Sequence, residues 1–193
     1  ALGIGIDVEE PVGNMIIDIG GGTTGITVIA LAGIVCDQSI RIAGDEFTAD
    51  IMEALRRYHS LLIGERTAEQ IKIQVGAAMK DLDNPPDDIP VNGIPKQVMV
   101  SYQEVAEALD KSIFKIEEAI LKALETTPPE LASDIYRRGL YITGGGALLR
   151  GLDKRLNAKI KLPVHVADDP LKSVVRGTGI ALKHYDRYPF VMR

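Results

Sequence analysis

The chain has 193 residues, of which 46% are hydrophobic, enough to hide about 70% of the surface that the unfolded chain would expose. Its formal net charge of −5 provides no broad basic field, which argues against a dedicated nucleic-acid-binding protein. A single cysteine, Cys36, excludes an internal disulfide framework and a four-cysteine zinc site. We therefore expect a globular protein of the cytoplasm with no nucleic-acid partner.

The beginning of the chain carries neither an initiator methionine nor the pattern of a signal peptide. No apolar run reaches the ~20 residues that a membrane-spanning helix needs. Because the chain lacks an initiator methionine, we expect it to be an excised piece or the ordered part of something longer.

The first third of the chain predicts three consecutive strands and then a helix. Short apolar and β-branched runs place the strands at residues 14–19, 26–29 and 34–42. From Asp45 the apolar spacing becomes helical, and Gly64 closes this predicted helix.

The middle of the chain predicts a second helix and a hairpin. Thr67 and Gln70 have the spacing of a capping box, which opens a helix that we expect to end near Lys80. Residues 81–95 hold four of the ten prolines and predict a loop with one hairpin, whose second strand is residues 97–100.

A second capping box, Ser101 with Glu104, predicts the start of a long helix that continues until two prolines end it. The remaining predicted elements are a helix at 131–137, a strand at 140–143, a helix at 149–156, a strand at 164–166 and a helix from Pro170.

This order of elements predicts an α/β fold with a mixed sheet. Strands open and close the chain, and a mostly helical section is inserted between them. We predict a larger nucleotide-binding lobe from residues 1–46 and 123–193, and a smaller inserted α+β lobe from residues 47–122.

The sharpest motif is a glycine-rich turn after the first strand. It contains the spacing G-x-G-x-x-G at Gly20, Gly22 and Gly25, but a dinucleotide fingerprint needs a following helix, and here a β-branched run follows. The motif therefore predicts a strand-to-strand turn whose amides and threonine hydroxyls approach phosphate oxygens. Asp18 at the strand end suits a hydrated Mg²⁺. The alternative is a tight hairpin turn with an incidental aspartate.

A second glycine cluster, Gly144 to Gly146, follows another apolar strand and precedes a predicted helix. Its backbone amides could pack on a nucleotide, and the alternative is a close-packing turn between strand and helix. Two such loops in one short α/β chain favour a divided nucleotide cleft.

Five motifs in this order resemble the second half of the bacterial actin-like, rod-shape-determining MreB family, within the superfamily of actin, sugar kinases and heat-shock chaperones. The likeness covers nearly all 193 residues. The motifs are Ile17-Asp18-Ile19-Gly20-Gly21-Gly22-Thr23-Thr24, Ala43-Gly44-Asp45-Glu46, Ile63-Gly64-Glu65-Arg66-Thr67-Ala68-Glu69-Gln70-Ile71-Lys72, Thr126-Thr127-Pro128-Pro129-Glu130-Leu131 and Thr143-Gly144-Gly145-Gly146-Ala147-Leu148-Leu149-Arg150-Gly151-Leu152.

The resemblance implies an actin-like ATPase fold with a ribonuclease H-like larger lobe, and a site for ATP or ADP with Mg²⁺. It places Asp18 near the metal and the attacking water. From the residues alone, Glu69 and Lys72 are a solvated i,i+3 ion pair. The resemblance implies a phosphate loop of Gly20, Gly21, Gly22, Thr23 and Thr24, an adenosine loop of Gly144, Gly145, Gly146, Ala147 and Leu148, and a helix that contacts base and ribose through Glu69, Gln70, Ile71 and Lys72.

The resemblance also implies ATP-dependent filaments that determine bacterial cell shape. Partners would be other copies of the protein, its N-terminal half, and cell-wall synthesis and membrane proteins at the inner face of the membrane. The family's first phosphate loop and hydrolytic glutamate would lie upstream of Ala1, so ATP hydrolysis belongs to the full-length protein. The alternatives are a kinase or chaperone-type ATPase of the same superfamily that does not polymerise, and a binding module without nucleotide.

Overall fold

A computed structural model describes residues 1–184 and 186–188. Residues 185 and 189–193 of the predicted larger lobe lie outside the described residues. Within the described part, five strands form one mixed sheet in the order β3-β2-β1-β6-β7, which confirms the predicted mixed strand directions.

The central strand of this sheet is β1 (Asn14–Ile19). It pairs antiparallel with β2 (Thr24–Ala30), which pairs antiparallel with β3 (Gly33–Ile40). On its other side β1 pairs parallel with β6 (Leu140–Thr143), and β6 pairs parallel with β7 (Val164–Val166). Parallel neighbours place their carboxyl ends at the same edge of the sheet.

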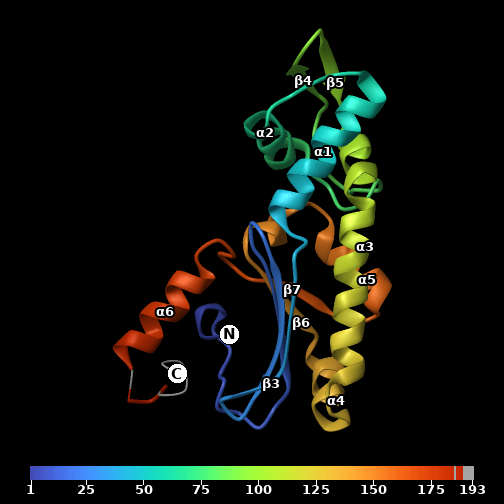
Figure 1. Cartoon of the computed structure of the whole chain (residues 1–193). Coiled ribbons are helices and arrows are strands. Elements are labelled where there is room, and N and C mark those ends of the chain that lie inside the picture. Colours follow the sequence, from blue (N-terminus) through green and yellow to red (C-terminus); the bar gives the residue numbers. More distant parts are fainter. Residues whose placement is uncertain (185, 189–193) are drawn as a thin grey trace.

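One face of the sheet is covered by the long helix α3 (Tyr102–Thr126), with α4 (Pro129–Arg138) and α5 (Leu152–Ile160) beside it (Figure 1). The predicted capping box forms at the start of α3. The Ser101 side chain accepts a hydrogen bond from the Glu104 amide, and the Glu104 side chain accepts one from the Ser101 amide. The residues of α3 that face the core are fully buried: Leu109, Ile113, Ile116, Ile120 and Ala123.

Beyond one end of the sheet lie α1 (Gly44–His59), α2 (Glu65–Val75) and the hairpin of β4 (Ile89–Asn92) and β5 (Gln97–Val100) (Figure 1). The N-terminal part of α3 continues past the sheet and packs against α1 and α2. Buried apolar residues therefore form one continuous cluster from the sheet to the hairpin.

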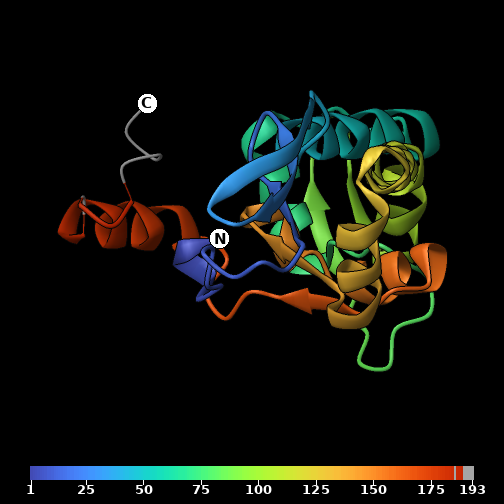
Figure 2. The same cartoon turned by 90° about the horizontal axis from the view of Figure 1, so that it is seen from below.

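The opposite side of the sheet carries the 3-10 helix η1 (Leu2–Ile4) and α6 (Ser173–Lys183), which pack against each other (Figures 1 and 2). Several large apolar side chains of and near α6 remain exposed: Leu171 at 66%, Val174 at 60% and Val175 at 75%. None of the helices that the structure describes combines the length and apolar character needed to cross a membrane.

The predictions from the sequence are wrong at several helix boundaries. α2 begins at Glu65 after Gly64, without a side-chain cap, so the expected capping box of Thr67 and Gln70 is wrong. It also ends at Val75, well before Lys80, because the chain extends at Gly76 and pairs with the strand-like segment at Arg150. α1 ends at His59, before Gly64, because Ser60 adopts the left-handed conformation that ends the helix. The other shifts are smaller: α4 begins at Pro129, α5 at Leu152 and α6 at Ser173.

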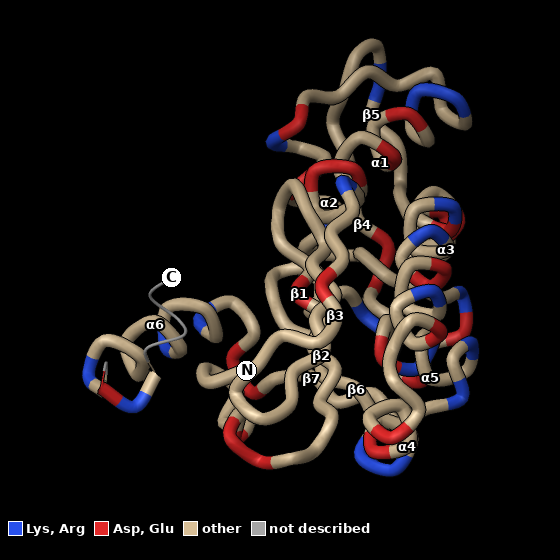
Figure 3. The backbone as a smooth tube through the Cα atoms, turned by 60° about the horizontal axis from the view of Figure 1, so that its bottom comes forward, with Lys and Arg blue, Asp and Glu red and all other residues tan. Residues whose placement is uncertain are grey.

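Both signs of charge alternate along α3, α4 and α5 (Figure 3). One of these charges is buried: Glu117 on α3 is 4% exposed, and its Oε1 accepts from Arg155 Nε at 2.7 Å. Arg155 also contacts Asp110 Oδ1 at 2.8 Å and donates to the Ala78 carbonyl at 2.9 Å. This arginine therefore ties α5 to α3 and to the segment after α2.

We expect Arg155→Met to keep the aliphatic stem but leave the Glu117 carboxylate buried without its cation. The free energy of unfolding should fall by roughly 3–5 kcal/mol, measured by urea denaturation. The control is Lys154→Met, on the same helix, which removes only an exposed ion pair with Asp83 and should leave the urea midpoint close to that of the unchanged protein. Equal losses in the two variants would contradict the assigned role of Arg155.

Candidate functional site

Both glycine loops leave the same edge of the sheet. Asp18, near the end of β1, is in register with Thr143, the last residue of β6. The loops that follow these two parallel strands therefore start side by side. In open α/β sheets such a carboxyl edge is the usual place for a ligand.

The first loop is a short connection between β1 and β2. The Gly20 amide donates to the Thr23 carbonyl at 3.0 Å and closes the turn, and Gly21, Gly22 and Thr23 are exposed. Thr24 is fully buried, and its hydroxyl donates to the Ile42 carbonyl at 2.6 Å. The hydroxyl of Thr24 thus anchors the loop, and the exposed surface is formed by the residues before it.

The fold does not need glycine at Gly21 and Gly22 of this first loop. The φ angles of Gly21 and Gly22 lie outside the left-handed region, and a Cβ on either residue would meet nothing closer than an Asp45 carboxylate oxygen at 3.6 Å. An ordinary residue would therefore fit there. What glycine adds is an open, bare backbone that a ligand can approach closely.

In the second loop, by contrast, the fold requires glycine at Gly144 and Gly146. Gly144 has φ 81° and ψ 173°, a conformation almost restricted to glycine, and its Cβ would lie 2.4 Å from the Ile19 carbonyl oxygen. A Cβ on Gly146 would lie 2.2 Å from Ile19 Cγ2. These glycines let the 3-10 helix η2 (Gly145–Leu148) pack against the end of β1. In η2, Ala147 is buried and Leu148 is 55% exposed.

The start of α1 is fastened to the first loop. The amide of Gly44 donates to the Gly20 carbonyl at 3.0 Å, and the amide of Asp45 donates to the Gly21 carbonyl at 2.8 Å. These bonds use two of the amides that a helix N-terminus leaves without partners inside the helix.

Glu69 and Lys72 on α2 belong to the same region. Lys72 Nζ lies 2.6 Å from Glu69 Oε2 and donates to the Gly44 carbonyl at 2.7 Å and to Thr48 Oγ1 at 3.0 Å. The Lys72 side chain is only 14% exposed, whereas that of Glu69 is 48% exposed. The pair is therefore a half-buried network and not a solvated surface pair.

The same network sets the charge state of Glu69. Partial burial of the carboxylate raises its pKa, but hydrogen bonds from Lys72 and Thr48 and the positive charge of Lys72 outweigh this effect. The pKa of Glu69 lies below its ordinary value, so the carboxylate is ionised and acts as a hydrogen-bond acceptor.

The other predicted residues of α2 lie differently. Gln70 is exposed, whereas Ile71 is 1% exposed and lies in the core. Sequence reasoning missed Thr48 on α1, which is 7% exposed and bonds to Glu69 Oε2 at 2.9 Å. The available signal was its place on the otherwise apolar stripe of the helix that contains Ile51 and Leu55.

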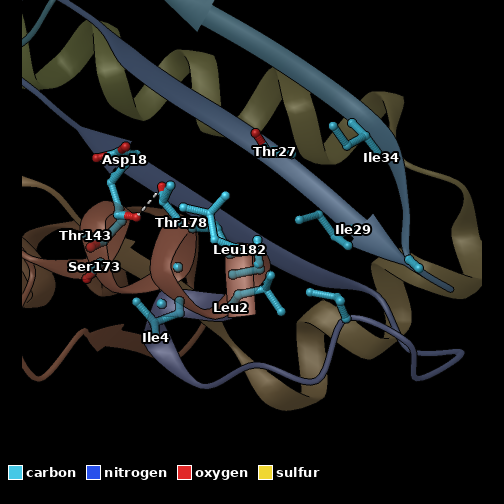
Figure 4. Close-up of a pocket in the computed structure, with 18 residues that line it drawn as sticks. Leu2, Ile4, Asp18, Thr27, Ile29, Ile34, Thr143, Ser173, Thr178 and Leu182 are labelled. Atoms are coloured by element: carbon cyan, nitrogen blue, oxygen red, sulfur yellow. Dashed lines mark hydrogen bonds between the residues drawn. The ribbon is translucent and has the colours of Figure 1, made fainter. Parts of the chain in front are cut away.

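An apolar hollow of about 730 Å³ adjoins the same edge of the sheet, on the face opposite α3 (Figure 4). Asp18 and Thr143 lie at one end of it, and Ile29 and Ile34 of β2 and β3 lie toward the other. The N-terminal segment and α6 form its remaining walls, including Leu2, Ile4 and Leu182.

Comparison with solved structures defines the class of protein. MreB5 of Spiroplasma citri bound to ADP aligns with a TM-score of 0.89 and 40% identity, over 95% of this chain and 57% of that chain. The MamK double helical filament aligns with a TM-score of 0.75 and 24% identity, over 89% of this chain and 54% of that chain, and supports the fold alone. The chain has the actin-like α/β fold, which confirms the fold expected from the sequence.

Sequence comparison identifies the family. The sequence model of the MreB/Mbl protein family matches residues 1–189, and the chain belongs to this family. It is 47% identical to the cell shape-determining protein Mbl of Bacillus subtilis (strain 168) over 193 residues, 98% of this chain and 58% of the relative. It is 44% identical to the cell shape-determining protein MreB of Escherichia coli (strain K12) over 197 residues, 97% of this chain and 55% of the relative. The chain thus spans a little over half the length of these relatives.

The contrast between the two glycine loops leads to a stability prediction. Gly144→Ala should lower the free energy of unfolding by about 1–3 kcal/mol or more, because the backbone conformation is strained and the new Cβ overlaps the Ile19 carbonyl. Gly22→Ala should unfold at the same temperature as the unchanged protein. Thermal unfolding followed by circular dichroism measures both, and a large loss for Gly22→Ala would contradict the description of the first loop.

Proposed function

We propose that this chain is the nucleotide-binding part of an actin-like cytoskeletal protein that forms ATP-dependent filaments and determines bacterial cell shape. The observation that carries the proposal is the bare first glycine loop, which starts beside the second loop and in which the fold itself does not require Gly21 and Gly22 to be glycine. Two crystal structures of one relative support it: MreB5 of Spiroplasma citri is bound to ADP in one and to AMPPNP in the other. The curated relatives are cell shape-determining proteins.

In this proposal the nucleotide phosphates lie on residues Gly20 to Thr23, of which Gly21, Gly22 and Thr23 are exposed. The adenosine packs on the second loop, residues 144–148, and the ionised Glu69 carboxylate accepts a hydrogen bond from the ribose. Asp18 holds Mg²⁺ through water. One carboxylate fits that role, because Mg²⁺ in nucleotide sites keeps several waters and takes its other ligands from phosphates. No group of three or more histidine, cysteine or acidic side chains gathers around a metal position in the described residues, so a site built only from protein ligands is not offered there.

ATP hydrolysis is proposed for the intact protein. In-line transfer of a phosphoryl group to water needs a complete phosphate cradle, a metal and an oriented water. The family resemblance assigns the other phosphate loop and the hydrolytic glutamate to the preceding half. This chain would supply the far side of the nucleotide.

We propose that the preceding half contacts the apolar hollow between the sheet and α6. That half would then cover the apolar walls of the hollow. The end of the hollow at Asp18 would open into the shared nucleotide cleft. The larger lobe would be residues 1–46 and 123–193 and the smaller lobe residues 47–122. Self-association, and contacts with cell-wall synthesis and membrane proteins at the inner face of the membrane, would be made by the intact protein.

Sedimentation tests the assembly part of this proposal. The intact protein should pellet as filaments with ATP and Mg²⁺ and stay in the supernatant with EDTA, whereas Asp18→Ala should pellet far less at the same concentration. The assembly proposal fails when no polymer forms at any protein concentration and a sugar instead stimulates ADP release. That result would identify a kinase of the same superfamily.

Calorimetric titration with ATP tests the phosphate loop. Gly22→Ala should weaken binding by about tenfold or more, which corresponds to about 1.4 kcal/mol, because the new methyl group stands where the phosphate oxygens approach the backbone. Gly33→Ala is the matched control, since it adds a methyl group at the exposed start of β3, where the nearest atom is 3.5 Å away. If Gly22→Ala bound ATP as tightly as the unchanged protein, the proposal that the phosphates lie on this loop would be wrong.

A further inference from the structure

The ammonium group of Lys72 is fully used by the protein itself. A lysine ammonium has three N–H donors, and Lys72 has three acceptors: Glu69 Oε2 at 2.6 Å, the Gly44 carbonyl at 2.7 Å and Thr48 Oγ1 at 3.0 Å. The side chain is 14% exposed. A nucleotide that took a hydrogen bond from Lys72 would have to break one of these bonds.

Thr48 is the buried centre of the network. Its hydroxyl lies 3.0 Å from the Gly44 carbonyl, 2.9 Å from Glu69 Oε2 and 3.0 Å from Lys72 Nζ. A hydroxyl carries one proton and two acceptor positions. It can therefore accept from Lys72 while it donates to Glu69 or to the Gly44 carbonyl, and it is too deeply buried, at 7% exposure, to present itself to a ligand.

Gly44 connects this network to the first glycine loop. Its amide donates to the Gly20 carbonyl at 3.0 Å, and its carbonyl accepts from Lys72 at 2.7 Å. A single residue at the start of α1 is thus bonded on one side to the loop and on the other side to α2. Both bonds are between groups of low exposure, where hydrogen bonds constrain position strongly.

We propose that Thr48 and Lys72 are positioning residues that couple the first glycine loop to Glu69. Glu69 is then the member of the network that meets the nucleotide. Its Oε2 is held by Lys72 and Thr48, while its other carboxylate oxygen remains available on a side chain that is 48% exposed. An ionised carboxylate oxygen held in one place selects ligands with hydroxyl donors, such as the vicinal hydroxyls of a ribose. This inference rests on the proposed nucleotide site and assigns Lys72 a role different from direct binding.

A double-mutant cycle separates positioning from direct binding. In the intact protein, Thr48→Val, Lys72→Met and Glu69→Gln should each weaken ATP binding and reduce its preference over 2′-deoxy-ATP and 3′-deoxy-ATP by about tenfold, the size expected for one charge-assisted hydrogen bond. In the Glu69→Gln background, Thr48→Val and Lys72→Met should have little further effect, because their action passes through Glu69. Additive losses would overturn the proposal and return Lys72 to the ligand contacts.

Thr127→Val is the control for loss of a buried hydroxyl. Thr127 is 6% exposed and donates to the carbonyl four residues earlier, at Ala123, in the geometry that Thr48 has toward Gly44, but it lies at the far end of α3. It should leave the preference for ribose unchanged. An equal loss of that preference in Thr127→Val and Thr48→Val would show a general effect on stability and contradict the proposal.

A measurement without nucleotide keeps this inference separate from the proposed function. The pKa of the Glu69 side chain, followed by carbon-13 chemical shifts, should lie below its ordinary value and rise in both Lys72→Met and Thr48→Val. An unchanged pKa in these variants would overturn the coupling. Failure of the unchanged protein to bind any nucleotide would instead overturn the proposed function and leave this measurement to decide the coupling.

Discussion

The parallel pairing of β1 with β6 is the constraint on which the rest of the site depends. Asp18 and Thr143 are far apart in the sequence, but the register of these strands places them opposite each other. Parallel strands cannot be joined by a tight turn, so the connection between them must cross over. The crossover here contains α3, which covers one face of the sheet. The N-terminal part of α3 extends past the sheet and packs against α1 and α2. At the edge where β1 and β6 end, the amides of Gly44 and Asp45 at the start of α1 bond to the first loop.

Two glycine clusters that look alike in the sequence act for different physical reasons. In the second loop, the carbonyl and side chain of Ile19 occupy the space that a Cβ would need at Gly144 and Gly146. In the first loop, no neighbouring atom and no left-handed φ requires glycine at Gly21 or Gly22. A glycine that the fold can do without points to a partner outside the fold. The first loop is therefore the stronger indication of a ligand, although the second loop is what places it.

The sequence was sufficient where local chemistry decides the outcome. Short apolar and β-branched runs predicted β1 to β3, and Ser101 with Glu104 predicted the start of α3. It failed where a tertiary contact decides, as at the end of α2, where pairing of Ala77 with Arg150 takes the chain out of the helix. The candidate site shows the same division. The glycines could be found from the motif, and the family resemblance pointed to Glu69 and Lys72, but the partners of the Lys72 ammonium and the buried hydroxyl of Thr48 depend on segments brought together only by folding.

The first loop, on which the proposed site places the phosphates, lies beside negative charges. Lys72 is already compensated by Glu69 at 2.6 Å, so it contributes little net positive charge toward the loop. Asp18 precedes the loop, and the Asp45 carboxylate faces Gly21 and Gly22. Phosphate oxygens placed on this loop would gain the dipoles of the backbone amides but would stand close to two carboxylates. In the proposed site, a divalent cation between Asp18 and the phosphates would offset that repulsion, so the nucleotide would bind there better as its magnesium complex than as free nucleotide.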